Sequence, residues 1–301
     1  MRRDILQKIV GFLVMVLVVG MSLLLTACSP EGYVLLEPKG PVGLSERNLI
    51  LTTIGLMLIV VIPVFVMTFW FAWKYRASNI HAAYTPRWSY SGPIEVLVWL
   101  IPSIIVTILG VLAWTSSHNL NPYKPIDPAV PPLRIEVIAL DWKWLFIYPD
   151  QGIATVNQVV IPVNVPVAFE ITSDTVMNSF FIPRLGGQIY AMAGMETSLH
   201  LMADKPGSYF GENTQYSGLG FPYQHFEAIA KPRRDFDKWV AQMKKSTRTL
   251  DRHSYSELAR PSVRNPVTHY SSVQPRLFED VMAKYRQDGM EKTPMQDQRA
   301  L

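Results

Sequence analysis

The chain of 301 residues contains one cysteine, Cys28, which ends the tetrapeptide LTAC of residues 25–28. Three basic residues and an apolar run over residues 9–25 precede it, which is the layout of a secretory signal. A leucine three places before the cysteine and a small residue directly before it are typical of a lipoprotein processing site. We therefore expect residues 1–27 to be removed and Cys28 to carry the acyl chains that hold the protein on a membrane. The alternative is an ordinary N-terminal anchor with an incidental cysteine.

Because Cys28 is the only cysteine, no disulfide can form within the chain and no metal site elsewhere in it can use a thiolate. The net charge of +4 excludes little, and the sequence has no interleaving of aromatic and basic residues. The composition therefore gives no reason to expect a nucleic-acid partner.

The second ionisable residue of interest is Glu95, because it lies inside an apolar run. Residues 49–73 carry no charge, and residues 94–114 carry only Glu95. Each run is long enough to cross a membrane as a helix. An ionisable side chain within a span is costly and often marks a proton or ion path, although a carboxylate near a helix end can also reach the water outside.

The charges beside the two spans predict their orientation. The loop of residues 74–93 carries basic residues and no acidic one, whereas residues 28–47 carry both signs. The positive-inside rule places the loop in the cytoplasm and everything after about Ser116 outside it. We expect a two-helix hairpin over residues 48–115, an outer N-terminal segment over residues 28–47, and a bacterial cytoplasmic-membrane protein whose C-terminal domain faces the periplasm.

The remaining residues predict a β-rich domain with a helical tail. Residues 116–132 are rich in proline and indicate a stiff linker. Alternating apolar residues then recur over residues 133–139, 163–171 and 198–202, with turn signals between them, which predicts an antiparallel sandwich or barrel over residues 133–230. Residues 231–301 contain two amphipathic patterns, at 236–244 and 277–286, and are expected to form a short helical extension rather than a second core.

Four stretches carry a resemblance to a known family: residues 93–102 (PIEVLVWLIP), 141–144 (DWKW), 176–183 (VMNSFFIP) and 213–226. In order and spacing they resemble subunit II of the haem-copper terminal oxidases, from about residue 30 to the end. The lipoprotein signal and the tail favour the quinol-oxidising, bo-type branch. The resemblance implies two transmembrane helices followed by a cupredoxin-like β-domain, and it implies that Glu95 lies at the cytoplasmic mouth of a proton path into subunit I.

In the cytochrome c oxidases of that family the β-domain holds a dinuclear copper centre, with the motifs V-L-H-S-x-x-x-P and C-S-E-x-C-G-x-x-H-x-x-M. Here the ligand positions are occupied by other residues: Asn178, Asn213, Gln215, Ser217, Phe221 and Gln224. Soft thiolates suit copper, and the only cysteine of the chain, Cys28, is the expected lipid attachment site. We expect no metal in this chain and no catalytic residue of its own.

Two further groups of residues could suggest a metal-related role. Met192, Met195, Met202 and His200 are soft ligands that would suit Cu(I), but methionine more often fills apolar cores, and we interpret them as packing and surface residues. Trp142 and Trp144 match the W-x-W of the family and are interpreted as packing residues, because there is no copper for them to serve.

The resemblance implies subunit II of a proton-pumping ubiquinol oxidase that reduces dioxygen to water. Haems and copper are expected in subunit I, and the expected partners are subunit I, small membrane subunits, membrane lipid and, through the complex, ubiquinol. Cytochrome c is not expected as a partner. The alternatives are subunit II of a menaquinol oxidase and, from a different class, a free-standing binding or assembly lipoprotein.

Overall fold

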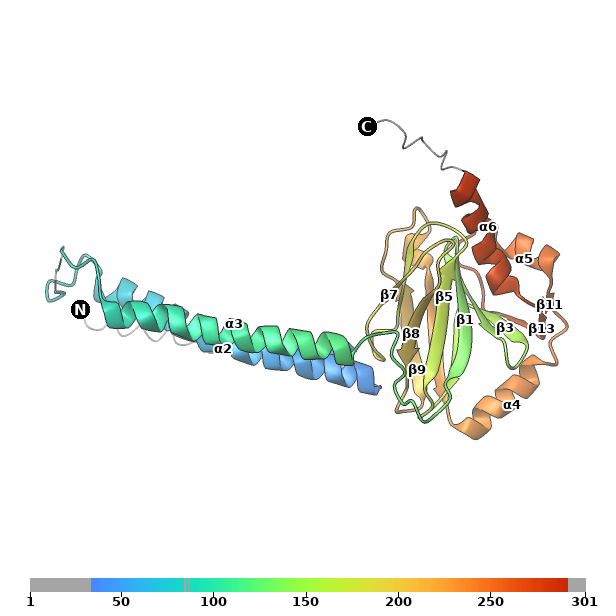
Figure 1. Cartoon of the computed structure of the whole chain (residues 1–301), viewed down its shortest axis with the longest axis horizontal. Coiled ribbons are helices and arrows are strands. Elements are labelled where there is room, and N and C mark those ends of the chain that lie inside the picture. Colours follow the sequence, from blue (N-terminus) through green and yellow to red (C-terminus); the bar gives the residue numbers. More distant parts are fainter. Residues whose placement is uncertain (1–33, 84, 86, 292–301) are drawn as a thin grey trace, which may run out of the picture.

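A computed structural model describes residues 34–83, 85 and 87–291 of the chain. Two long helices project from a β-rich domain, and three shorter helices lie at the side of that domain away from them (Figure 1). Cys28 and the signal lie outside the described residues, so the lipid attachment stays a prediction.

The two long helices are α2 (Pro41–Lys74), which follows a short 3-10 turn (Val34–Leu36), and α3 (Gly92–Asn119). A proline in the first turn starts each helix, where its missing N–H has no partner to lose. Both are long and apolar enough to cross a membrane, and most of their apolar side chains are exposed. They also continue beyond the predicted spans 49–73 and 94–114, on the side that faces the β-domain.

This continuation attaches the hairpin to the β-domain. The backbone N–H groups of Lys39 and Gly43 donate to the carbonyls of Arg184 and Leu185, at 2.7 and 3.0 Å, and Asp204 donates to Lys39 at 2.8 Å. Gly40 permits the contact, because a Cβ at this position would lie 2.2 Å from the Met202 carbonyl oxygen. The hairpin is therefore attached through backbone hydrogen bonds and not only through the linker.

The β-domain is a sandwich of two sheets. Its strands are β1 (Leu133–Leu140), β2 (Lys143–Tyr148), β3 (Ile153–Val156), β4 (Gln158–Pro162), β5 (Val167–Ser173), β6 (Asn178–Phe181), β7 (Ile189–Ala191), β8 (Thr197–Leu201), β9 (Gly207–Asn213) and β10 (His225–Lys231). One sheet has the order β12-β3-β2-β1-β5-β8, in which β12 (Thr268–Tyr270) comes from the C-terminal segment, and the other has the order β4-β10-β9-β6-β7. Aromatic side chains fill the space between them, with Trp144, Phe180 and Phe226 in edge or stacked contact.

Two sequence-based expectations about these strands are wrong. The sandwich is not purely antiparallel, because β1 pairs with β5 and β4 pairs with β10 in parallel. The apolar run over residues 163–171 is not one strand either. It begins with a turn in which Asn164 has a φ of 58°, and β5 starts at Val167, because the chain crosses there from one sheet to the other.

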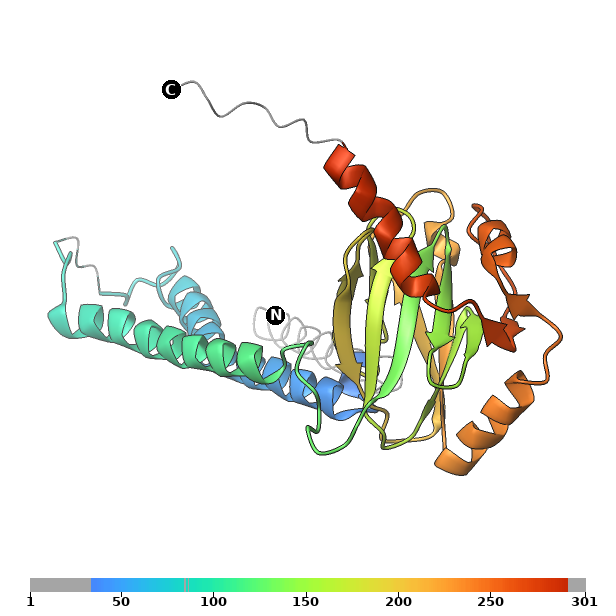
Figure 2. The same ribbon diagram turned by 45° about the vertical axis from the view of Figure 1, so that its right-hand side comes forward.

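The C-terminal segment contains α4 (Arg233–Met243), β11 (Thr249–Leu250), α5 (Arg252–Leu258), β12 (Thr268–Tyr270), β13 (Ser272–Val273) and α6 (Leu277–Glu291). The two predicted amphipathic helices are present as α4 and α6. The expectation of an extension without a core is wrong, because β12 joins the larger sheet and α5 and α6 close a second apolar cluster on its outer face. Figure 2 shows α6 lying across this sheet.

Burial on both faces explains why β1 does not keep its alternating pattern. The residues that alternate with the apolar phase include Glu136 and Ile138, which are 9 % and 0 % exposed. Two polar anchors fix the covering segment in place. Lys143 Nζ donates to the Arg260 carbonyl at 2.7 Å, and the buried carboxylate of Asp174 accepts from Tyr255 Oη and Lys284 Nζ, each at 2.7 Å.

The buried carboxyl of Glu136 makes this second interface sensitive to pH. Burial and, after it, the carboxylates of Glu279 on α6, Glu170 on β5 and Glu196 together raise the pKa of Glu136 to about 7, against the opposing effect of Arg134. The folded form therefore binds a proton more tightly than the unfolded chain does. Its contribution to stability is full below about pH 4.5 and is lost as the pH rises through 7.

We expect Glu136→Gln to stabilise the interface between β1 and α6 at pH 8 and to leave it unchanged at pH 5. The gain should be about 1–2 kcal/mol, since a shift of one pKa unit corresponds to about 1.4 kcal/mol and the open groove beside Glu136 admits screening water. Amide hydrogen exchange of residues 133–140 and 277–285 measures it. The exposed Glu257 on α5 gives the control Glu257→Gln, and an equal effect at both pH values would contradict this account.

Candidate functional site

The positions that match the copper ligands of the resembling family lie at the ends of three neighbouring strands. Asn178 begins β6, Asn213 ends β9, and Gln224 directly precedes β10. Strand β9 pairs with both β6 and β10, so these three side chains are brought to one edge of the smaller sheet. The loop of residues 214–223 returns over them and adds Ser217.

Four of these side chains form a closed hydrogen-bonded cluster, which we call the amide cluster: Asn178, Asn213, Ser217 and Gln224. Asn213 Nδ2 donates to Asn178 Oδ1 at 2.8 Å and to Gln224 Oε1 at 2.9 Å. Gln224 Nε2 donates to Asn178 Oδ1 at 2.9 Å, and Ser217 Oγ donates to Gln224 Oε1 at 2.8 Å. Asn178, Asn213 and Gln224 are 0 %, 4 % and 1 % exposed.

The backbone around the amide cluster uses the polar atoms that remain. Asn213 Oδ1 accepts from the N–H groups of Ser179 and Gln215, at 2.8 and 3.0 Å. Asn178 Nδ2 donates to the Val176 carbonyl at 2.7 Å, and Gln224 Nε2 is 3.3 Å from the Leu140 carbonyl. Each buried amide therefore has partners for both its oxygen and its nitrogen, which a buried polar network needs in order to stabilise a fold.

The two other matched positions do not contribute side chains to the cluster. Gln215 is half-buried and takes part through its backbone N–H. Phe221 begins a 3-10 turn (Phe221–Tyr223), and its ring packs against Tyr216 with 5.7 Å between the centroids. The structure thus brings together four of the six predicted positions.

Trp142 covers the same loop from outside, next to the amide cluster. Its indole N–H donates to the Ser217 carbonyl at 3.0 Å, and its ring lies over two glycines. A Cβ at Gly220 would lie 2.1 Å from the Trp142 ring, and Gly218 has a φ of 105°, so both positions require glycine. Trp144 is fully buried in the core, in keeping with the packing role predicted for both tryptophans.

The amide cluster does not fit a dinuclear copper centre. Such a centre needs thiolate and imidazole donors, whereas the cluster offers amide and hydroxyl groups that already bond to one another. Over the described part of the chain, no three His, Cys, Asp or Glu side chains are placed to hold a metal ion. His200 of the second candidate set is engaged elsewhere, since its Nδ1 lies 3.0 Å from the Pro122 carbonyl.

Glu95 lies at the opposite end of the molecule from the amide cluster. It occupies the first turn of α3, at the end of the hairpin that is far from the β-domain (Figure 1). Its exposed side chain lines a shallow groove together with Tyr90, Trp99 and Ser103.

Two polar features of the structure have no counterpart among the residues singled out from the sequence. Lys143 and Asp174 anchor the C-terminal segment, and Glu46 and Lys124 line a cavity at the foot of the β-domain. Neither pair belongs to a motif. The one local signal is the position of Lys143 between Trp142, in the turn before β2, and Trp144 on that strand, which favours burial.

We expect Asn213→Ala to destabilise the β-domain by about 2–3 kcal/mol, because it leaves buried partners on Asn178, Gln224 and Ser179 without hydrogen bonds. Denaturant unfolding followed by tryptophan fluorescence measures the change. Gln215→Ala is the matched control, since its side chain lies outside the amide cluster. Equal losses for the two variants would show that the cluster is not a stabilising unit.

Comparison with known proteins places this arrangement in a family. The family model "Cytochrome C oxidase subunit II, periplasmic domain" matches residues 150–226, and the model "COX Aromatic Rich Motif" matches residues 244–289. The first match contains the amide cluster. The second covers α5, β12 and most of α6, the segment that closes the second apolar cluster.

Curated relatives extend the likeness over most of the chain. The "Cytochrome bo(3) ubiquinol oxidase subunit 2" of Pseudomonas putida is 56 % identical over 270 residues, which cover 90 % of this chain and 84 % of the relative. The "Ubiquinol oxidase subunit 2" of Acetobacter aceti is 52 % identical, with 88 % and 85 % covered. The "Quinol oxidase subunit 2" of Bacillus anthracis is 34 % identical, with 91 % and 96 % covered.

Among solved structures, the periplasmic domain of subunit II of the cytochrome oxidase of Bradyrhizobium japonicum is similar to part of the chain. It is 25 % identical, with 38 % of this chain and 97 % of that chain covered, and the TM-score is 0.37.

Proposed function

The chain belongs to the subunit 2 family of the quinol oxidases, and from this premise we propose that it is subunit II of a proton-pumping ubiquinol oxidase of the bacterial cytoplasmic membrane. In this proposal the complex oxidises ubiquinol and reduces dioxygen to water. The chain itself carries no redox centre, while subunit I holds the haems and the copper. Its own roles are to assemble against subunit I, to cover it on the periplasmic side and to help shape proton entry.

The observation that carries the proposal is the amide cluster. A water-soluble donor such as cytochrome c delivers single electrons at the membrane surface, so the oxidase needs a metal centre there as the port that accepts them. The cluster occupies the positions of that port with neutral, hydrogen-bonded side chains. A quinol is soluble in the membrane and can deliver its electrons within it, so a complex that uses quinol can retain the domain without the metal.

The hairpin supports the proposed assembly and location. Along α2 and α3, exposed apolar side chains face outward over the length of a bilayer, and hydroxyl groups within the spans donate to carbonyls four residues earlier, as Thr68 does at 2.7 Å. Such a surface can be covered by lipid, by subunit I or by small membrane subunits. The proposed orientation places the β-domain in the periplasm, where an acylated Cys28 would add a second attachment.

Two alternatives lead to different measurements. The 34 % identical relative is named a quinol oxidase without a stated quinone, so menaquinol is the alternative substrate of the complex. A free-standing binding or assembly lipoprotein is the alternative of another class. The two apolar helices argue against it, because a lipid anchor alone would hold a binding domain on the membrane.

Purification in mild detergent tests the proposed function directly. We expect haem absorbance to copurify with this chain, together with oxygen uptake that depends on ubiquinol and not on ferrocytochrome c. Faster turnover with menaquinol than with ubiquinol would favour the alternative substrate. A colourless preparation that binds a solute would contradict the assignment to an oxidase.

We expect Glu95→Gln to slow proton uptake and quinol-dependent turnover several-fold, because the variant cannot release a proton at the mouth of the hairpin. Ser103→Ala, in the same groove, is the matched control for disturbance of the helix surface. Stopped-flow proton uptake and oxygen consumption of the assembled complex measure the effect. Wild-type rates in an assembled Glu95→Gln complex would exclude the proposed role.

A further inference from the structure

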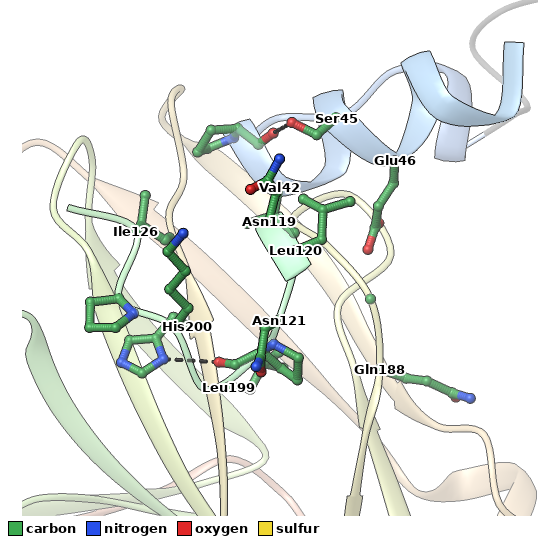
Figure 3. A pocket seen from close by; sticks show the side chains of 15 residues that line it. Val42, Ser45, Glu46, Asn119, Leu120, Asn121, Ile126, Gln188, Leu199 and His200 are labelled. Carbon is green, nitrogen blue, oxygen red and sulfur yellow. Dashed lines mark hydrogen bonds between the residues drawn. The ribbon is translucent and has the colours of Figure 1, made fainter. Parts of the chain in front are cut away.

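A polar cavity of about 370 Å³ lies where the hairpin meets the β-domain. Its walls are the first turns of α2, the end of α3 with the linker that follows, and strand β8 with the loop before β7 (Figure 3). Seven polar side chains line it: Ser45, Glu46, Asn119, Asn121, Lys124, Gln188 and His200. Neither the amide cluster nor Glu95 is part of it.

The cavity lies at the depth of the lipid head groups. On α2 the continuous run of exposed apolar side chains begins at Ile50, after an isolated one at Leu44, and on α3 the run ends at Trp114. At a rise of about 1.5 Å per residue, Glu46 and Asn119 lie about 6 and 7 Å beyond these limits. The head-group layer of a bilayer extends about 5–8 Å beyond each side of its hydrocarbon core, so both residues are at its level.

The walls of the cavity are held in place without a ligand. The backbone N–H and the ring Nδ1–H of His200 both donate to the Pro122 carbonyl, at 3.1 and 3.0 Å, which fixes the linker against β8 (Figure 3). On the opposite side, the N–H of Gly187 donates to the Glu46 carboxylate. A Cβ at Gly187 would lie 2.9 Å from Glu46 Oε1, so the close approach depends on glycine.

Two opposite charges in this cavity lack ionic partners. Among the described residues, no cationic side chain pairs with Glu46 and no carboxylate pairs with Lys124. Glu46 is nevertheless half-buried, which costs free energy for a charged group without a partner. A ligand that carries an ammonium group and a phosphate would supply a partner to each charge.

We propose that this cavity binds the head group of an aminophospholipid of the periplasmic leaflet, with the ammonium group at Glu46 and the phosphate at Lys124. The carboxylate of Glu46 and the amide oxygen of Asn119 can accept N–H bonds of a primary ammonium group. The site goes beyond the proposed function and depends on it only through the orientation of the hairpin. Bound lipid would fill the junction that fixes the β-domain relative to the membrane.

The test uses the whole detergent-purified complex, transferred into nanodiscs of phosphatidylethanolamine with phosphatidylglycerol, or of phosphatidylcholine with phosphatidylglycerol. After delipidation, native mass spectrometry counts the lipid that remains bound. We expect the wild-type complex to retain phosphatidylethanolamine, and Glu46→Gln and Lys124→Ala each to retain at least ten-fold less of it. Glu257→Gln, on α5 and outside the cavity, is the control and should behave as the wild type. Phosphatidylcholine should be retained poorly, because its trimethylammonium group has no N–H to donate.

Equal retention of phosphatidylethanolamine by the wild type and Glu46→Gln would overturn the proposal, and so would equal retention of phosphatidylcholine. Binding of soluble O-phosphoethanolamine without any retained lipid would overturn the assignment to the membrane. If Glu46→Gln fails to assemble, a photoreactive phosphatidylethanolamine decides the question on the wild-type complex. Labelling of residues 119–126 or 187–200 supports the site, and labelling of subunit II only elsewhere contradicts it. Quinol oxidase activity of the same preparation reports separately on the proposed function.

Discussion

Buried amide groups must form hydrogen bonds, and at one edge of the smaller sheet Asn178, Asn213, Ser217 and Gln224 satisfy this requirement with one another. Three strand ends, the returning loop and Trp142 are arranged around this closed set. If one of the four side chains were removed, buried donors and acceptors would be left without partners. This would cost more folding free energy than replacing all of them with apolar side chains. The interaction is therefore a stabilising element of the domain, in the place where a metal-binding relative would use metal bonds to hold the same loop.

The domain also needs a cover for the apolar outer face of its larger sheet, and the C-terminal segment provides it. Because α5 and α6 pack there and β12 extends the sheet beside β3, strands β1 to β3 are buried on both faces. The C-terminal segment also buries polar side chains of the larger sheet, and these differ in how they are stabilised. Lys143 and Asp174 have hydrogen-bond partners within the protein, whereas Glu136 is held among other carboxylates and favours its protonated form.

The sequence predicted the elements well and their arrangement less well. The two long apolar helices and the strand at residues 133–140 follow from local patterns of apolar residues and breakers, although both helices extend beyond the predicted spans. The parallel pairing of β1 with β5 does not, since the pairing depends on which sheet the chain enters after a turn. At the amide cluster the six positions follow from the resemblance to the family's copper motifs, but only the fold decides that the side chains of Gln215 and Phe221 stay outside the cluster. The burial of Glu136 and the cavity beside Glu46 both arise from contacts between distant segments, which no local pattern records.

The measurement that most directly tests the account is a titration of the purified protein with copper, followed by visible absorption, electron paramagnetic resonance and metal analysis after gel filtration. The amide cluster has no free donors and no thiolate. We therefore expect no charge-transfer bands, no dinuclear signal and no copper retained with the β-domain. A retained dinuclear copper centre that accepts electrons from ferrocytochrome c would contradict the account.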